Sequence, residues 1–328
     1  MRKILSTILI GAVAFNVMGT SLVSASDNTI KAEVNQVASN VENITGNEEI
    51  STGASVTNEA YYYTESEIDI TLPVRGDDLV TLDNGKDKIS FLLPSEAADN
   101  EGRQTSNGTI VYYGDENAQI SMQTYEAGYV RSLISIDNAD ASHSYSYEFD
   151  LDQGSKLVSS DKYDSIAESS GSVFIVDGNN DIIGLIGAPW AVDANGDEVE
   201  THFEIEENVL MQVVEFDENT AFPVIADPTV SNIVYKGGLT KNQCKKLYNR
   251  ADQYTKYDKF VDMAEAIIID LAKACDTKVG TAIALITALG KVFGKYNSMK
   301  SGFYQGKNNN GLSILLFSSG DMSYTVRK

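Results

Sequence analysis

The side chains that most often carry chemistry in proteins are scarce in this chain. Among its 328 residues are two histidines, two cysteines and one tryptophan. Structural zinc sites, iron–sulfur clusters and disulfide-dense scaffolds each require several such ligands or bridges, so these numbers argue against all three. The sequence motifs of nucleotide-binding loops, zinc proteases and serine hydrolases are missing as well. We therefore expect no catalytic residue, no metal and no cofactor, and we interpret the protein as a non-enzyme.

The two cysteines are expected to form a disulfide. Cys244 would lie one turn into a first predicted helix and Cys275 at the end of a second, and these positions are neighbours in an antiparallel helical hairpin. A disulfide is the expected state in the oxidising environment outside the cell, and this one would close a loop of 30 intervening residues. The alternative is a cysteine nucleophile. It is disfavoured because His143 and His202 both fall in a β-rich part of the chain and no family signature surrounds either cysteine.

Charge divides the chain into two opposite parts. Residues 26–229 carry 8 basic and 40 acidic side chains, a net charge of −32, whereas residues 230–328 carry 15 basic and 7 acidic side chains, a net charge of +8. The uncharged stretch 279–290 would span only about 18 Å as a helix, which is too short to cross a bilayer. Because lysines flank it, it could instead lie on an anionic membrane or cell surface. The residues predicted to make this contact are Lys278, Lys291, Lys295, Ile283, Leu285, Ile286, Leu289, Val292 and Phe293.

Two further statements about partners follow from the same charge pattern. The acidic body is expected to attract the cationic tail within the same chain. Nucleic acid is not expected as a partner, because the basic residues are dispersed rather than clustered. A solvated helical face decorated with lysines is the plainer interpretation of the tail.

The N-terminal segment has the features of a secretory signal peptide over residues 1–25. Arg2 and Lys3 precede an uncharged stretch that closes on Val23-Ser24-Ala25, which predicts cleavage after about Ala25. We therefore expect the mature protein to be secreted and extracellular. Residues 26–59, rich in Ser, Thr, Asn and Glu, are predicted to be a disordered leader.

The rest of the sequence predicts an α+β protein. Residues 60–229 hold short alternating runs separated by Gly, Asn and Asp clusters, which indicate an antiparallel all-β domain. Residues 236–328 predict a small helical hairpin or three-helix module that ends in a β-hairpin, joined to the β domain through Lys236-Gly237-Gly238. Thr240 and Gln243 have the spacing of a capping box at the start of the first helix. The predicted strands are 68–72, 88–92, 110–113, 129–136, 145–149, 173–176, 182–186, 202–205 and 209–214, and the hairpin strands are 311–317 and 322–326.

Two motifs near the end of the β domain resemble a known family. Residues 187–196 read GAPWAVDANG, and residues 222–229 read FPVIADPT. They resemble the APWAxDANG and (Y/F)PVxADP motifs of a largely uncharacterised family of secreted proteins from Gram-positive bacteria. In that family the segment closes an acidic β domain before a variable, cysteine-containing C-terminal module. The resemblance covers about 45 residues and implies export but no catalytic residue. We interpret Asp227-Pro228 within it as the turn that ends the domain.

Two functions are compatible with these features. The first is the precursor of a membrane-active, bacteriocin-like C-terminal module that the acidic β domain masks. The second is a secreted surface or matrix interaction protein that acts intact through its β domain. The charge reversal and the short apolar segment favour the first, whereas the absence of a full-length hydrophobic span favours the second.

Overall fold

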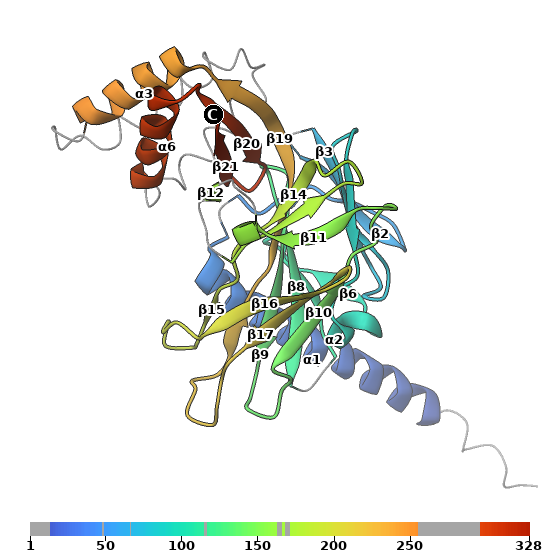
Figure 1. Cartoon of the computed structure of the whole chain (residues 1–328). Helices are drawn as coiled ribbons and strands as arrows, with labels where there is room; N and C mark the ends of the chain where they lie inside the picture. Colours follow the sequence, from blue (N-terminus) through green and yellow to red (C-terminus); the bar gives the residue numbers. More distant parts are fainter. Residues whose placement is uncertain are drawn as a thin grey trace, which may run out of the picture.

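The computed structural model (Figure 1) describes residues 14–47, 49–65, 67–114, 117–162, 166–167, 171–254 and 296–328. The fold is α+β, with antiparallel strands as the main element and few helices among the described residues. The helices are α1 (Ala14–Thr45), α2 (Ser95–Ala98), α3 (Lys241–Tyr254) and α6 (Tyr296–Asn308), with a 3₁₀ turn at Ser160–Lys162. The strands are β1 (Ser55–Val56), β2 (Ala60–Glu65), β3 (Ile68–Pro73), β4 (Val80–Asp83), β5 (Lys88–Phe91), β6 (Gly102–Gln104), β7 (Ile110–Tyr112), β8 (Ala118–Tyr125), β9 (Tyr129–Ile136), β10 (Ser144–Glu148), β11 (Lys156–Ser159), β12 (Ile166–Ala167), β13 (Val173–Val176), β14 (Ile182–Ile186), β15 (Ala191–Val192), β16 (Thr201–Glu206), β17 (Val209–Val214), β18 (Val224–Ala226), β19 (Thr229–Leu239), β20 (Leu312–Phe317) and β21 (Met322–Val326).

The strands form three antiparallel sheets. Strands β1 to β5 make a meander in chain order, and β10, β17 and β16 make a small sheet. The largest sheet runs in the order β11-β13-β14-β19-β9-β8-β7-β6, and β12, β15, β18, β20 and β21 attach to this path. Every predicted strand of residues 60–229 has a counterpart among them, so the predicted strands and their antiparallel arrangement are confirmed.

The main core lies where the inner faces of the three sheets meet. Alternate residues of β3, β4 and β5 point into it, as the burial pattern of β3 illustrates with Ile68, Ile70 and Leu72. Aromatic rings join the sheets, since Phe91 stacks on Phe149 with 5.2 Å between ring centroids and meets Tyr147 edge-on at 6.3 Å. This core fixes the position of β10, from which the acidic groove described below begins.

Helix α1 covers the outer face of the large sheet, so the prediction of a disordered leader over residues 26–59 is wrong. Val34, Val37 and Val41 recur at helical spacing and are buried. Val34 and Val37 belong to a cluster with Val111 of β7, and Val41 belongs to one with Leu133 of β9. The sequence did not predict this helix because its apolar residues are few and lie in a polar segment. They are buried only when they pack against the sheet.

Strand β19 joins the β body to the C-terminal module. Its first part pairs with β9 and β14, and its last part, from Ile233 to Leu239, pairs with β20. The predicted connection at Lys236-Gly237-Gly238 therefore lies inside a strand, and the predicted module boundary at residue 236 cuts through it. Gly237 and Gly238 have a packing role, because an added Cβ would collide with the Tyr235 ring or with the guanidinium of Arg327.

The C-terminal module follows the sequence prediction at its two ends. Helix α3 begins with the predicted capping box: the Gln243 amide donates to Thr240 Oγ1 at 3.3 Å, and the Thr240 amide donates to Gln243 Oε1 at 2.8 Å. The hairpin of β20 and β21 is confirmed. Helix α6 was not predicted, because Gly302 and Gly306 lower helix propensity. The predicted helical segments 260–275 and 279–290 lie outside the described residues.

Candidate functional site

The sequence-predicted site residues are only partly described by the structure. Cys244 is buried in α3, with its Sγ 4.0 Å from the Leu239 carbonyl oxygen, and burial raises the pKa of its thiol to about 11. A thiol of that pKa is a poor nucleophile near neutral pH. Outside the described residues lie Cys275 and all the predicted surface-contact residues, namely Lys278, Lys291, Lys295, Ile283, Leu285, Ile286, Leu289, Val292 and Phe293. The disulfide and the membrane contact therefore stay predictions.

Helices α3 and α6 together present a cationic face that carries two tyrosines. The ring centroids of Tyr248 and Tyr304 are 5.6 Å apart. The Lys307 Nζ lies 3.4 Å from the Tyr248 centroid and 4.8 Å from the Tyr304 centroid, and the Lys300 Nζ lies 5.8 Å from that of Tyr248. Tyr304 is 48% exposed. Because ring faces attract cations, the Tyr248 ring draws the head groups of both lysines towards it. We call this surface the Lys/Tyr face.

The packing of the two helices explains why this face is exposed. Cys244 and Leu247 turn towards the module's interior, as does Phe303 of α6. Gly306 lets α6 approach closely, since an added Cβ would meet the Cys244 Sγ. The opposite side of α3 is left to solvent. Its exposed cations are Lys241, Lys245 and Lys246, of which Lys241 and Lys245 share the side of Tyr248 and extend the Lys/Tyr face.

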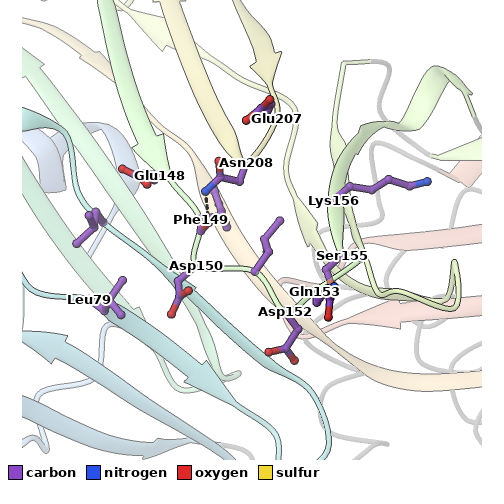
Figure 2. Close-up of a pocket in the computed structure, with 13 residues that line it drawn as sticks. Leu79, Glu148, Phe149, Asp150, Asp152, Gln153, Ser155, Lys156, Glu207 and Asn208 are labelled. Carbon is purple, nitrogen blue, oxygen red and sulfur yellow. Dashed lines mark hydrogen bonds between the residues drawn. The ribbon is translucent and has the colours of Figure 1, made fainter.

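An open groove of about 660 Å³ lies beside the link between β10 and β11 (Figure 2). Its apolar surface includes Leu79, Leu92 and Leu151, and Figure 2 shows Asp150 and Asp152 on the linking chain, with Leu79 beside them. The groove is lined by Leu79, Leu92, Glu148, Phe149, Asp150, Leu151, Asp152, Gln153, Gly154, Ser155, Lys156, Glu207 and Asn208. Four of these residues are carboxylates and one is a lysine, so the groove favours cationic groups.

Backbone hydrogen bonds hold the groove in shape. The Phe149 amide donates to the Asn208 carbonyl at 2.9 Å, and Asn208 Nδ2 donates to the Phe149 carbonyl at 2.8 Å. On the other side, the Asp150 amide donates to the Ser90 carbonyl at 2.9 Å. The carboxylates on the rim therefore stand on a fixed backbone.

A buried polar cluster brings the two family-like motifs together. Trp190 comes from the first motif and Asp227 from the second, and both lie against Arg131 of β9. The Arg131 Nε donates to Thr229 Oγ1 at 3.1 Å, and that hydroxyl donates to Asp227 Oδ2 at 2.8 Å. The Trp190 amide donates to Asp227 Oδ1 at 3.3 Å, and the Trp190 ring lies 5.9 Å from the Arg131 guanidinium carbon.

Asp227 was interpreted from the sequence as part of a turn, but its side chain belongs to this buried cluster. Burial raises the pKa of its carboxyl to about 7, while the charge of Arg131 and the hydrogen bonds from Thr229 and Trp190 act in the opposite direction. The motif itself is the sequence signal for Trp190 and Asp227. Arg131 stands far from both in sequence, and no local pattern marks it.

The same cluster is linked to helix α1. The Arg131 Nη1 donates to the Tyr125 hydroxyl at 3.3 Å, and that hydroxyl donates to Gln123 Oε1 at 2.6 Å. Gln123 Nε2 then donates to Thr45 Oγ1, near the end of α1, at 3.2 Å. The cluster thus ties the sheet, the motifs and α1 into one unit, which is a structural role.

The described residues contain no group of three or more His, Cys, Asp or Glu side chains placed to hold a metal ion. The Asp-rich turns use their carboxylates on their own backbone: Asp193 Oδ1 accepts from the Asn195 amide at 2.8 Å and from the Asp197 amide at 3.0 Å. In the same part of the chain, no helix combines the length and the apolar character that a membrane crossing requires. Comparison with known proteins found no matching family model, curated protein or solved structure.

Proposed function

We propose that this protein is a secreted, non-enzymatic binding protein that acts in one piece. Its acidic β body carries a cationic module, and the Lys/Tyr face of that module contacts an anionic membrane or cell surface. The proposal includes the membership in the secreted Gram-positive family that the two motifs resemble. It also includes a three-helix form of the module and the Cys244–Cys275 disulfide.

The observation that carries the proposal is the continuity of β19. One strand pairs with β9 and β14 in the body and with β20 in the module. A shared apolar cluster supports the junction, since Phe174, Val176 and Leu185 of the body pack with Phe317 of β20. Removing the module would break this cluster and leave the middle of the large sheet without part of a strand. This cost supports the intact protein over a module that is released.

The geometry also supports a surface contact by the Lys/Tyr face. Helix α6 has no acidic residue, and α3 has one, Asp252. A lysine near an anionic surface contributes about 1 kcal/mol, and a tyrosine suits the polar–apolar boundary of a membrane. Figure 1 shows α3 and α6 at one end of the molecule, away from β10 and β17 of the body.

The test uses the secreted, full-length mature protein and vesicles of anionic or neutral lipid at physiological ionic strength. The parent should bind anionic vesicles and leave neutral ones alone. Replacing Lys241, Lys245 and Lys307 with Gln should weaken binding about 100-fold, which corresponds to about 1 kcal/mol for each lysine. The matched control replaces Lys31, Lys88 and Lys162 of the body, all exposed, with Gln. If both triple variants bind equally, the Lys/Tyr face is not the contact surface.

A second candidate, the masked precursor of a membrane-active module, is favoured by one specific contact. Lys236 of the module forms an ion pair with Asp181 of the body, so at this point opposite charges of the two parts meet. Mass spectrometry of the protein recovered from the culture medium separates the two candidates. A single species ending at Lys328 supports the intact protein, whereas a fragment starting between residues 230 and 240 supports the precursor.

A further inference from the structure

A cleft of about 560 Å³ lies at the junction between the body and the module. One wall is a face of the sheet formed by β19, β20 and β21, and the other is the turn before β14 with Asn180, Asp181 and Ile182. The cleft is within the size range of small-molecule sites. It uses no residue of α3 or α6, and it is separate from the acidic groove.

The strand register shows which side chains share the sheet face of this cleft. Directly opposed residues of antiparallel strands point to the same side. Two rows of opposed residues line the cleft: Lys236, Leu315 and Ser323, and Gly238, Ser313 and Thr325. The wall therefore combines a lysine with three hydroxyls and one aliphatic side chain.

Arg327 adds a second cation at the edge of this wall. Its Nε donates to Ser313 Oγ at 3.2 Å, and its guanidinium lies over Gly238, where any larger residue would displace it. The N–H groups of the guanidinium that do not bond Ser313 can be offered to an oxyanion. Gly238 leaves the space that the Arg327 guanidinium occupies.

The one carboxylate on the opposite wall, Asp181, does not neutralise both cations of the sheet wall. Lys236 pairs with Asp181, but both side chains are more than half exposed, and such pairs contribute about 1 kcal/mol or less. With Lys236 and Arg327 against Asp181, the charged residues of the cleft lining leave one positive charge in excess.

One polar group in the cleft wall lacks a hydrogen-bond partner. Ser323 is 2% exposed, and its Oγ has no partner among the described residues. A buried hydroxyl without a partner costs about 1–3 kcal/mol, so such groups are usually satisfied by a ligand or by water. The register places Ser323 in the row with Lys236 and Leu315, facing the cleft.

We propose that this cleft binds a phosphate group carried by a small polyol, with glycerol phosphate as the simplest example. Arg327 and Lys236 hold the phosphate oxygens, Ser313, Ser323 and Thr325 serve the hydroxyl groups, and Leu315 and Ile182 contact the carbon chain. Phosphate takes the place of Asp181 at Lys236, since the exposed ion pair is weak. The same chemistry is found in lipid headgroups and in phosphate-linked polyol polymers, and the experiment distinguishes these sources.

The test is isothermal titration calorimetry of the full-length mature protein with glycerol phosphate, inorganic phosphate and glycerol at low ionic strength. Glycerol phosphate should bind at one site, inorganic phosphate more weakly, and glycerol not at all. Ser323→Ala should weaken glycerol phosphate binding about 3- to 10-fold, the usual effect of one hydrogen bond, without lowering the urea midpoint. Arg327→Gln should weaken it further, and Lys88→Gln on the body serves as the charge-matched control.

Two further arms identify the source and keep the site apart from the proposed surface contact. Vesicles of a glycerophospholipid should compete with glycerol phosphate if the ligand is a lipid headgroup, whereas a soluble glycerol phosphate polymer should compete if it is a polymer unit. The triple Gln variant of the Lys/Tyr face should bind glycerol phosphate like the parent. The proposal is overturned if the folded parent gives no saturable heat, or if Ser323→Ala and Arg327→Gln bind as tightly as the control.

Discussion

Asp227→Asn should remove a dependence of stability on pH that the buried carboxyl creates. The folded state holds the Asp227 proton up to a pKa of about 7, whereas an unperturbed aspartate has a pKa of 3.8. Between these two pH values, unfolding releases a proton. The stabilisation is therefore fully present below pH 3.8, is lost as pH rises towards 7, and stays lost above it. An amide has the shape of the protonated carboxyl and does not titrate. The free energy of unfolding of Asp227→Asn therefore lacks this dependence on pH.

The size of the effect follows from the two pKa values. Their difference is about 3 units, and each unit corresponds to about 1.4 kcal/mol. Ionisation of this carboxyl should therefore lower the free energy of unfolding of the parent by on the order of 4 kcal/mol between pH 4 and pH 7.5. The measurement is urea unfolding at several pH values, followed by the fluorescence of Trp190. Trp190 is the one tryptophan of the chain, and its backbone amide donates to Asp227. The parent should lose free energy of unfolding relative to Asp227→Asn as pH rises.

Comparison with a second variant separates this term from the other carboxyl groups. Asp217 is exposed, and hydrogen bonds from Asn219 lower the pKa of its carboxyl, so Asp217→Asn should change the pH dependence in the opposite direction. If the free-energy difference between the parent and Asp227→Asn stays constant with pH, burial does not control this carboxyl. If the parent gains free energy of unfolding relative to Asp227→Asn as pH rises, the charge of Arg131 outweighs burial and the reasoning fails.

Three other changes test separate parts of the fold. Thr240→Ala removes the hydrogen bonds that the Thr240 hydroxyl makes with Gln243 and should lower the free energy of unfolding by about 1 kcal/mol, measured by urea denaturation, with no change if the cap is unimportant. Val41→Ala should leave a cavity under α1, cost about 2 kcal/mol and speed hydrogen exchange in α1, and unchanged exchange would contradict the packing of that helix. Thiol labelling of the protein, purified without reductant, should modify neither Cys244 nor Cys275 before reduction, even in denaturant. Labelling of both in denaturant without reductant would exclude the disulfide.

The sequence predicted the elements that local chemistry controls. The spacing of Thr240 and Gln243 is enough to place the start of α3, since both partners of the cap lie within one turn. The alternation from Ile68 to Leu72 likewise determines which side of β3 is buried. In both cases the interaction that stabilises the element is made by the residues whose spacing predicts it, or by their direct neighbours.

Most failures of prediction depend on distant partners. The valines of α1 look like isolated residues in a polar leader until the face of β7 and β9 is in place. Gly237 and Gly238 look like a linker, although they make room for Tyr235 and Arg327, and Arg327 is near the end of the chain. Asp227 looked like a turn residue because its partners, Arg131 and Trp190, come from other strands and loops. Spacing along the chain carries no signal of such contacts.

The charge distribution leads to a last prediction, on how salt affects surface binding. Because β19 joins the two parts, the acidic body accompanies the cationic module to any surface, and its net charge of −32 over residues 26–229 repels an anionic one. The Debye length falls from about 30 Å at 0.01 M salt to about 10 Å at 0.1 M, so added salt first screens the distant body while the lysines still act at contact range. Binding to anionic vesicles should therefore rise with salt, pass through a maximum and then fall as the lysines are screened too. Co-sedimentation over a series of salt concentrations measures this curve. A released module, free of the body, would show only the fall, so a steady decrease for the full-length protein would mean that the body does not act at the surface.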